Sequence, residues 1–323
     1  MDKGRGHELL YRYKIESLEK NKELLYGYIA RFGLEQSISC NLMEDDIRVV
    51  FCDNRALVRK WKAFTHLVSS LPWRGSVGRQ LKVFVMCGDC ILGMVHLTSP
   101  LAQLRARDEL LGWDKDSKWK EKQINRVYNI ETCVPTRKYA PVLTGKLLVY
   151  LIFSREVIGQ LYERYGDEVL GFETTSLFGE SSMYNRIPFL RYLGLTDGLS
   201  GVYLTDTEWR GILKEYYEVF PCTKTSRLAP AKFQIVDKLR NYYKTRGLDF
   251  PYLYQSEQFR RGIYFGFVKD ADLPIAEMVT QWRQRWLLGR LSRGYKPDVA
   301  SLGLSQPAED WLNRIGYRQL SFM

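Results

Sequence analysis

The 323-residue chain is 45% hydrophobic and carries a net charge of +11, which excludes a disordered polypeptide and favours an acidic partner. Its longest apolar run, residues 147–153, is too short to span a bilayer, and its first residues lack the apolar stretch of a signal peptide. Six cysteines without an export signal predict reduced thiols, so we expect a cytoplasmic protein with no membrane partner.

Residues 1–75 have the pattern of a helical N-terminal segment. Apolar side chains recur at helical spacing from residue 7 to Gly33, a residue that suits a helix C-cap. Residues 46–52 alternate as a short strand does, and residues 54–71 return to helical spacing. The loop that follows, PWRG, marks the boundary of this segment.

The predicted core, residues 76–205, begins with a hairpin. Residues 81–86 and 91–97 are two β-rich runs, and the Gly88-Asp89 pair between them suits a tight turn because glycine tolerates positive φ. Ser99 followed by Pro100 is typical of a helix start. We therefore expect a helix after the hairpin.

Strands and helices then alternate. A strand at 126–134, an apolar helix after Gly145, a strand within 167–177 and a helix containing Tyr184 follow in order, and a closing strand is expected near Val202. This series predicts an α/β (α+β) fold with a mixed central sheet and flanking helices.

The predicted C-terminal region, residues 206–323, is basic and mostly helical. Helical spacing in four stretches, 206–217, 230–245, 274–291 and 307–315, indicates an all-α accessory layer. Between 224 and 261 the chain has nine basic and three acidic residues, interleaved with aromatics, as in proteins that bind phosphates and stack bases. A solvated basic helix with its aromatics in the core is the alternative interpretation.

The candidate nucleic-acid contacts lie in that stretch and in the core. Tyr184, Asn185 and Arg186 offer a phenol, an amide and a guanidinium suited to a base or phosphate edge. The full set of basic and amide candidates comprises Arg107, Asn185, Arg186, Lys232, Lys238, Arg240, Lys244 and Arg246.

The candidate catalytic residues are Glu131, Glu173 and Tyr184. The two glutamates lie near the ends of successive strands, where a pair of carboxylates can act as general base and acid. Salt bridges to nearby Arg or Lys are the alternative. Cys87 and Cys90 have the spacing of a zinc pair, but a second such pair is missing, and we predict no metal site.

Gly145 and Lys146 precede an apolar helix and suggest a phosphate-binding loop. The alternative is that the glycine lets the helix pack closely against its strand.

Several motifs in order resemble the DruA-like family of the Druantia anti-phage systems, which also occurs in phages and beside transposases. The resemblance covers roughly residues 76–205. It rests on Arg107-Asp108, Leu111-Gly112-Trp113, Gly145, Glu173-Thr174, Tyr184-Asn185 and the run GLTDG at 194–198.

The element order is also similar to the acetyltransferase superfamily called GNAT, in which a glycine-rich loop holds the pyrophosphate of acetyl-CoA. Here that loop, residues 135–145, has one glycine and two prolines, and proline cannot donate a hydrogen bond. The resemblance implies acyl-CoA as the cofactor, with Arg137, Lys138, Gly145 and Lys146 around it, but the loop composition leaves the cofactor open.

Three interpretations follow. In the first, the protein associates with nucleic acid, with DNA favoured, alongside protein partners of a defence or phage complex. In the second, the GNAT-like core is an active transferase that modifies a base or another target. In the third, the chain is a basic structural protein without a nucleic-acid role.

Overall fold

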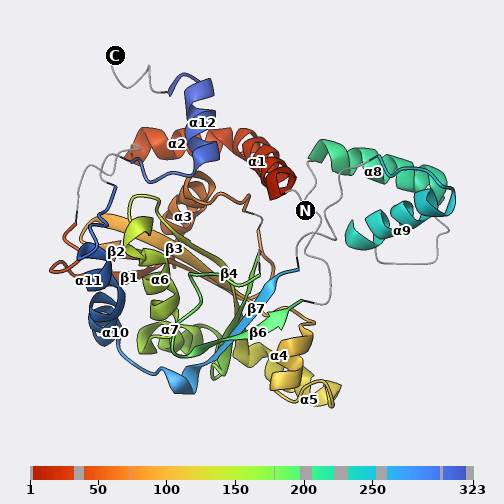
Figure 1. The fold of residues 1–323 in the computed structure, drawn as a ribbon. Helices are drawn as coiled ribbons and strands as arrows, with labels where there is room; N and C mark the ends of the chain where they lie inside the picture. Colours follow the sequence, from red (N-terminus) through yellow and green to blue (C-terminus); the bar gives the residue numbers. More distant parts are fainter. Residues whose placement is uncertain are drawn as a thin grey trace.

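A seven-stranded mixed sheet forms the centre of the computed structural model, which describes residues 3–32, 40–73, 75–177, 179–196, 206–221, 232–251, 260–298 and 301–317. The strand order is β1-β2-β3-β4-β5-β7-β6, with helices on both faces (Figure 1). All neighbouring strands are antiparallel except β4 and β5. The strands are β1 (Ile47–Phe51), β2 (Gln80–Cys87), β3 (Cys90–Thr98), β4 (Val127–Pro135), β5 (Gly171–Ser176), β6 (Leu190–Leu195) and β7 (Gly262–Phe267). The predicted α/β (α+β) class with a mixed sheet and flanking helices is confirmed.

Most helices lie where the hydrophobic spacing predicts them. Among the helices that the structure describes, none is long and apolar enough to cross a membrane. A π-helical segment, Arg283–Leu287, connects α10 to α11. The helices are α1 (Lys3–Lys20), α2 (Lys22–Phe32), α3 (Arg55–Val68), α4 (Arg105–Leu110), α5 (Ser117–Gln123), α6 (Thr144–Ile152), α7 (Arg155–Tyr165), α8 (Asp206–Val219), α9 (Lys232–Thr245), α10 (Ile275–Trp282), α11 (Leu288–Leu291) and α12 (Gln306–Arg314).

The predicted hairpin is confirmed as β2 and β3. Gly88 has a φ of 54°, in the left-handed region that glycine adopts without strain. Cys87 and Cys90 are register partners on either side of the turn, and both are buried. The thiols therefore close the apolar end of the hairpin.

The side chains of this hairpin alternate between two cores, one on each face of the sheet. Val83 and Val85 face the core shared with α6, α7 and α10, whereas Phe84 between them faces the core shared with α2, α3 and α12. Because both faces are covered by helices, the strands are apolar on both sides.

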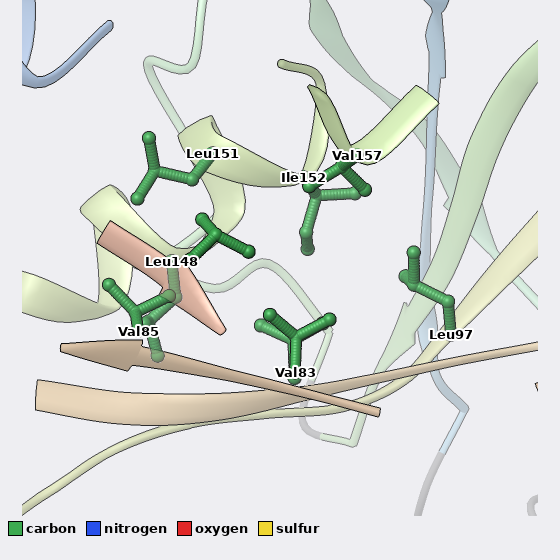
Figure 2. Close-up of a pocket in the computed structure, with 9 residues that line it drawn as sticks. Val83, Val85, Leu97, Leu148, Leu151, Ile152 and Val157 are labelled. Atoms are coloured by element: carbon green, nitrogen blue, oxygen red, sulfur yellow. The ribbon is translucent and has the colours of Figure 1, made fainter. Parts of the chain in front are cut away.

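Figure 2 shows the contact between the sheet and α6, with side chains of both elements pointing toward one another. Val83, Val85 and Leu97 from the strands meet Leu148 and Ile152 from the helix around a void of about 10 Å³. Such a space holds at most one water molecule and is lined by apolar side chains, so this face of the sheet is a packed core and not a ligand site.

One predicted helix of the core starts later than expected, and another is wrong. No helix begins at Pro100, because the backbone of Leu101 bonds to Glu173 and Arg107, and α4 starts only at Arg105. The stretch around Tyr184 forms turns instead of a helix, and Arg186 has a φ of 67°, which ends any helical path. The closing strand expected near Val202 lies outside the described residues.

The all-α interpretation of the C-terminal region is wrong at residues 262–267. These residues form β7, which lies between β5 and β6. Gly266 allows this position, because a Cβ there would lie 2.6 Å from the carbonyl oxygen of Phe189. With β1 drawn from residues 1–75, the sheet takes strands from all three predicted segments.

Helices α8 and α9 form a pair beyond the N-terminal end of α1, beside the main body (Figure 1). They have their own small core, in which Ile212 of α8 meets Ile235, Val236 and Leu239 of α9. An ion pair of 3.0 Å between Arg12 and Glu208 connects the pair to α1.

Candidate functional site at the β4 and β5 cleft

The sheet opens where β4 and β5 separate. These parallel strands pair only at Val127–Gly171, Tyr128–Phe172 and Asn129–Glu173. After that, Thr174 uses its side-chain hydroxyl to donate to the carbonyl of Ile130 (2.9 Å), and the strands part. A cleft of about 620 Å³ lies between their C-terminal halves. Parallel strands commonly place ligands beyond their carboxyl ends.

The cleft combines aromatic rings, hydroxyl groups and few charges. A carboxylate (Glu131), a guanidinium (Arg261) and a phenol (Tyr184) are among its polar groups. Its lining comprises Tyr13, residues 69–73, residues 131–134, residues 174–177, Ser181, Met183, Tyr184 and Arg261. Few charges and many hydroxyls suit an organic ligand with both ring and polar edges.

Glu131 is the carboxylate of the cleft. Its Oε1 accepts a hydrogen bond from Ser76 (2.5 Å), and its Oε2 lies 2.5 Å from Nδ1 of His96. Burial alone would raise the pKa of Glu131, but the His96 and Ser76 contacts outweigh it and hold the pKa below its usual range. With a side chain that is 34% exposed, Glu131 is an ionised acceptor that a ligand can reach.

Aromatic rings surround His96 behind this carboxylate. His96 is fully buried, and the rings of Trp61 and Trp73 lie 5.3 and 6.2 Å from it. Burial lowers the pKa of His96, so the imidazole is neutral at pH 7. His96 therefore orients Glu131 without neutralising it.

Tyr184 also lines the cleft. It is buried, its ring lies 5.1 Å from that of Tyr264, and burial raises its pKa, so its phenol keeps its proton. The cleft thus brings together two of the three predicted catalytic residues, one as an ionised acceptor and one as a protonated donor.

The third predicted catalytic residue, Glu173, is elsewhere. Its carboxylate is fully buried and accepts from Arg107 Nη1 and from the amide of Leu101, both at 2.7 Å. Arg107 also bonds Asp108, which bonds Lys120 at 2.7 Å. Burial raises the pKa of Glu173 although Arg107 opposes it. Glu173 and the predicted nucleic-acid contact Arg107 thus bind each other inside the protein.

The loop between β4 and α6 is the predicted pyrophosphate site. Six of its backbone amides donate hydrogen bonds within the chain, and Pro141 has no amide hydrogen. Donors to backbone oxygens include the amides of Thr136, Arg137, Tyr139, Ala140, Val142 and Leu143. These residues therefore do not fit the backbone cradle that acetyl-CoA requires in the GNAT superfamily.

The N-terminus of α6 is covered as well. A Cβ on Gly145 would lie 3.0 Å from the sulfur of Met183, which fits the close-packing interpretation of this glycine. Lys146 donates to the carbonyls of Ser182 (2.6 Å) and Asn185 (2.5 Å), and burial lowers its pKa to about 8. Both predicted cofactor residues hold the 181–186 turns against the helix.

The remaining cofactor candidates lie beside the C-terminal segment. Arg137 is 52% exposed and makes contacts of 3.1 and 3.4 Å with Gln306 and Glu309. Lys138 is buried, with its ammonium 5.7 Å from the ring centre of Tyr139. Neither residue lines the cleft.

The predicted nucleic-acid residues divide by exposure. Asn185 accepts from Tyr264 (2.8 Å) through its side chain, whereas Arg186 is exposed. On α9, Lys238 and Lys244 are exposed and Arg240 is half-buried, and Arg246 is exposed in the turn that follows the helix. The side chain of Lys232 lies outside the described residues. The aromatics there pack together, with Tyr243 and Phe250 at 5.7 Å, as the alternative interpretation predicted.

Sequence reasoning missed the residues that support Glu131. Trp73 and Ser76 come from the stretch between α3 and β2, whereas His96 comes from β3, and only the fold brings the two stretches together. The available signal was the alternation of β3, which puts a histidine in an otherwise apolar strand.

The family model described as Druantia protein DruA matches residues 7–218. The chain belongs to the DruA family. A curated member, Druantia protein DruA of Escherichia coli (strain UMEA 4076-1), is 29% identical over 162 residues, which is 44% of this chain and 39% of the relative. The alignment thus spans about two fifths of that relative's length. No solved structure matches significantly.

Proposed function

We propose that this DruA-family protein works in anti-phage defence and binds nucleic acid, with a nucleotide seated in the β4 and β5 cleft. The match to a family and a relative described as Druantia proteins supports the defence role. DNA is the favoured partner, and other proteins of the defence system complete the assembly.

The composition of the cleft is the observation that carries the proposal. A space of about 620 Å³ accommodates a nucleotide. Trp73 offers a ring for stacking, and among the described residues its indole nitrogen has no hydrogen-bond partner. Glu131 accepts from base amino groups, and Tyr184 donates to base or sugar oxygens.

Exposed basic residues support the same partner. Lys238 and Lys244 are exposed on α9 and Arg246 is exposed just after it, and the chain carries a net charge of +11. Lysine and arginine side chains of this kind neutralise phosphates and make binding depend on salt.

A matched pair of tryptophan variants tests the proposal. Stacking of a base on an aromatic ring contributes roughly 1–3 kcal/mol, so Trp73→Leu should weaken single-stranded oligonucleotide binding about tenfold, and Trp73→Phe less. Trp119→Leu changes a tryptophan on α5 that is 49% exposed and outside the cleft, and should have no effect. Fluorescence anisotropy measures the affinities, with thermal melting as the check on folding. Equal affinities for all four proteins would overturn a nucleotide site in the cleft.

A second candidate is a transferase that modifies a base. The cleft between the separated parallel strands supports it, because an ionised Glu131 and a protonated Tyr184 both line it and could serve as general base and acid. Any cofactor would bind without the six amides of the loop at 136–143 that already donate within the chain.

Mass spectrometry of nucleosides tests the second candidate. DNA co-expressed with the wild-type protein should contain a nucleoside that is absent with Glu131→Gln and present with Glu168→Gln, a control carboxylate that is 81% exposed. Identical nucleoside profiles would remove base modification and leave binding.

A further inference from the structure

A second recess lies between α2 and α3, on the helical face away from α6. We call it the α2–α3 groove; its volume is about 170 Å³. Small residues open it: Gly27 of α2 and Ala56 and Ala63 of α3 line it, where larger side chains would fill the space between the helices.

Three cations surround the groove. Arg31 comes from α2, and Arg59 and Lys60 come from α3. None of the three forms an ion pair with a carboxylate among the described residues, and the sequence of α3 contains no acidic residue. Burial lowers the pKa of Lys60, and no carboxylate offsets that effect. Positive charge in a recess without a partner favours an anion.

An exposed aromatic ring stands beside these charges. Phe32 is 45% exposed, with Lys60 Nζ at 4.9 Å and Arg31 Cζ at 5.2 Å from its ring centre. An acidic peptide would supply carboxylates to the cations, but a planar ring only where an aromatic residue happens to stand beside them. A nucleic-acid strand supplies phosphates and bases at adjacent positions.

We propose that the α2–α3 groove binds the backbone of single-stranded nucleic acid, with phosphate oxygens on Arg31, Arg59 and Lys60 and a base or sugar against Phe32. The inference rests on the nucleic-acid partner of the proposed function. A recess receives a strand, whereas reading a duplex requires an element that protrudes into its groove, and this favours single strands over duplex.

Two variants with different chemistry test the groove. Arg31→Ala/Arg59→Ala/Lys60→Ala removes the charges, and Ala56→Leu fills the recess without changing charge. Lys115→Ala/Lys118→Ala removes exposed charges near and on α5 and serves as the control for overall charge. Binding of a single-stranded oligothymidine and of a matching duplex is measured by anisotropy over a range of salt concentrations, and thermal melting checks each fold.

The triple variant should bind the single strand at least about tenfold more weakly. Its log–log salt slope should fall by about 2, because each phosphate that the protein no longer neutralises lowers the slope by about 0.7. Ala56→Leu should also bind the single strand more weakly than the wild type, but its salt slope should stay closer to the wild-type value than that of the triple variant. The α5 control should change neither the affinity nor the slope by much. Wild-type affinity in the groove variants, an equal loss of affinity in the α5 control, or a loss confined to duplex would overturn the groove. A wild-type protein that binds no oligonucleotide would instead refute the proposed function.

Discussion

Glu131 on β4 and Glu173 on β5 occupy neighbouring strands of one sheet, yet their surroundings are opposite. Glu131 opens on the cleft and is oriented by Ser76 and a neutral His96. Glu173 points into a closed space and is bound by Arg107 and the amide of Leu101. The same residue type is thus available to a ligand in one place and unavailable in the other.

The difference arises from what packs against each strand end. The strands separate after Asn129, which leaves Glu131 without a neighbour on the β5 side. The irregular segment before α4 supplies the amide of Leu101 to Glu173, and α4 itself supplies Arg107. A carboxylate near a strand end is therefore available to a ligand where it stays partly exposed, as Glu131 does, and unavailable where it is fully buried in an ion pair, as Glu173 is.

The largest expected effect on stability comes from removing the ion-pair partner of Glu173, the buried carboxylate. Arg107→Met leaves Glu173 buried without its partner and should lower the free energy of unfolding by about 3–5 kcal/mol. Arg105→Met removes an arginine of the same helix whose side chain is 74% exposed, and should cost less than about 1 kcal/mol. Urea unfolding compares the two. Similar decreases in stability would mean that the Glu173 pair does not hold this region together.

Removing a buried cation that has no carboxylate partner among the described residues should have the opposite effect and stabilise the fold. Lys14 is 0% exposed, its ammonium donates to the carbonyl of Leu71 (3.3 Å), and burial lowers its pKa to about 7. Lys14→Met should therefore stabilise the fold by roughly 2–4 kcal/mol at neutral pH. Lys20→Met, exposed on the same helix, is the control.

The pH dependence has a definite sign. Between pH about 7 and 10.5 the unfolded chain keeps the Lys14 proton and the folded protein has lost it, so wild-type stability rises with pH. The gain from Lys14→Met should be largest below pH 7 and shrink toward pH 10.5. Thermal melts across this range measure it, and a gain that stays constant with pH would contradict the assignment.

Glu131, the carboxylate of the cleft, should contribute less to stability than the Arg107–Glu173 ion pair does. Glu131→Gln should cost about 1 kcal/mol at pH 7, because a hydrogen bond to a charged acceptor is weakened. A lowered pKa stabilises the fold above the unfolded value of 4.5, and this contribution is lost as pH falls through the folded value. The difference between wild type and variant should thus disappear in acid. A larger decrease in stability than for Arg107→Met would reverse the comparison.

The smallest effect extends the comparison to thiols. Cys40 is half-buried, and hydrogen bonds with Cys87 and Tyr139 lower its pKa to about 6, whereas burial raises the pKa of Cys52 to about 12. Iodoacetamide at pH 7 should label Cys40 first among the described cysteines, as peptide mass spectrometry would show. Earlier labelling of Cys52 would contradict the packing around the two thiols.

Local chemistry explains which parts of the fold were predictable. The β2–β3 hairpin followed from Gly88, and α8 and α9 from helical spacing. Strand β7 was missed because it is buried on both faces and follows a long helical region. Tyr184 lines the cleft, but it lies in turns and not in the predicted helix, since these turns depend on Lys146 binding their carbonyls. The support of Glu131 by His96 depends on pairing between β3 and β4, which a sequence alone does not show.

The central claim is that a nucleic-acid strand binds in the β4 and β5 cleft. Photo-cross-linking tests it most directly, because it identifies the peptides beside a bound strand whichever contacts hold that strand. Single-stranded DNA carrying a photoreactive thymine analogue is irradiated with the wild-type protein, and the cross-linked peptides are identified by mass spectrometry. The account predicts cross-links in the peptides containing Trp73 and Tyr184, which line the cleft, and their disappearance on competition with unmodified strand. Cross-links confined to α8 and α9, with the cleft peptides unmodified, would contradict it.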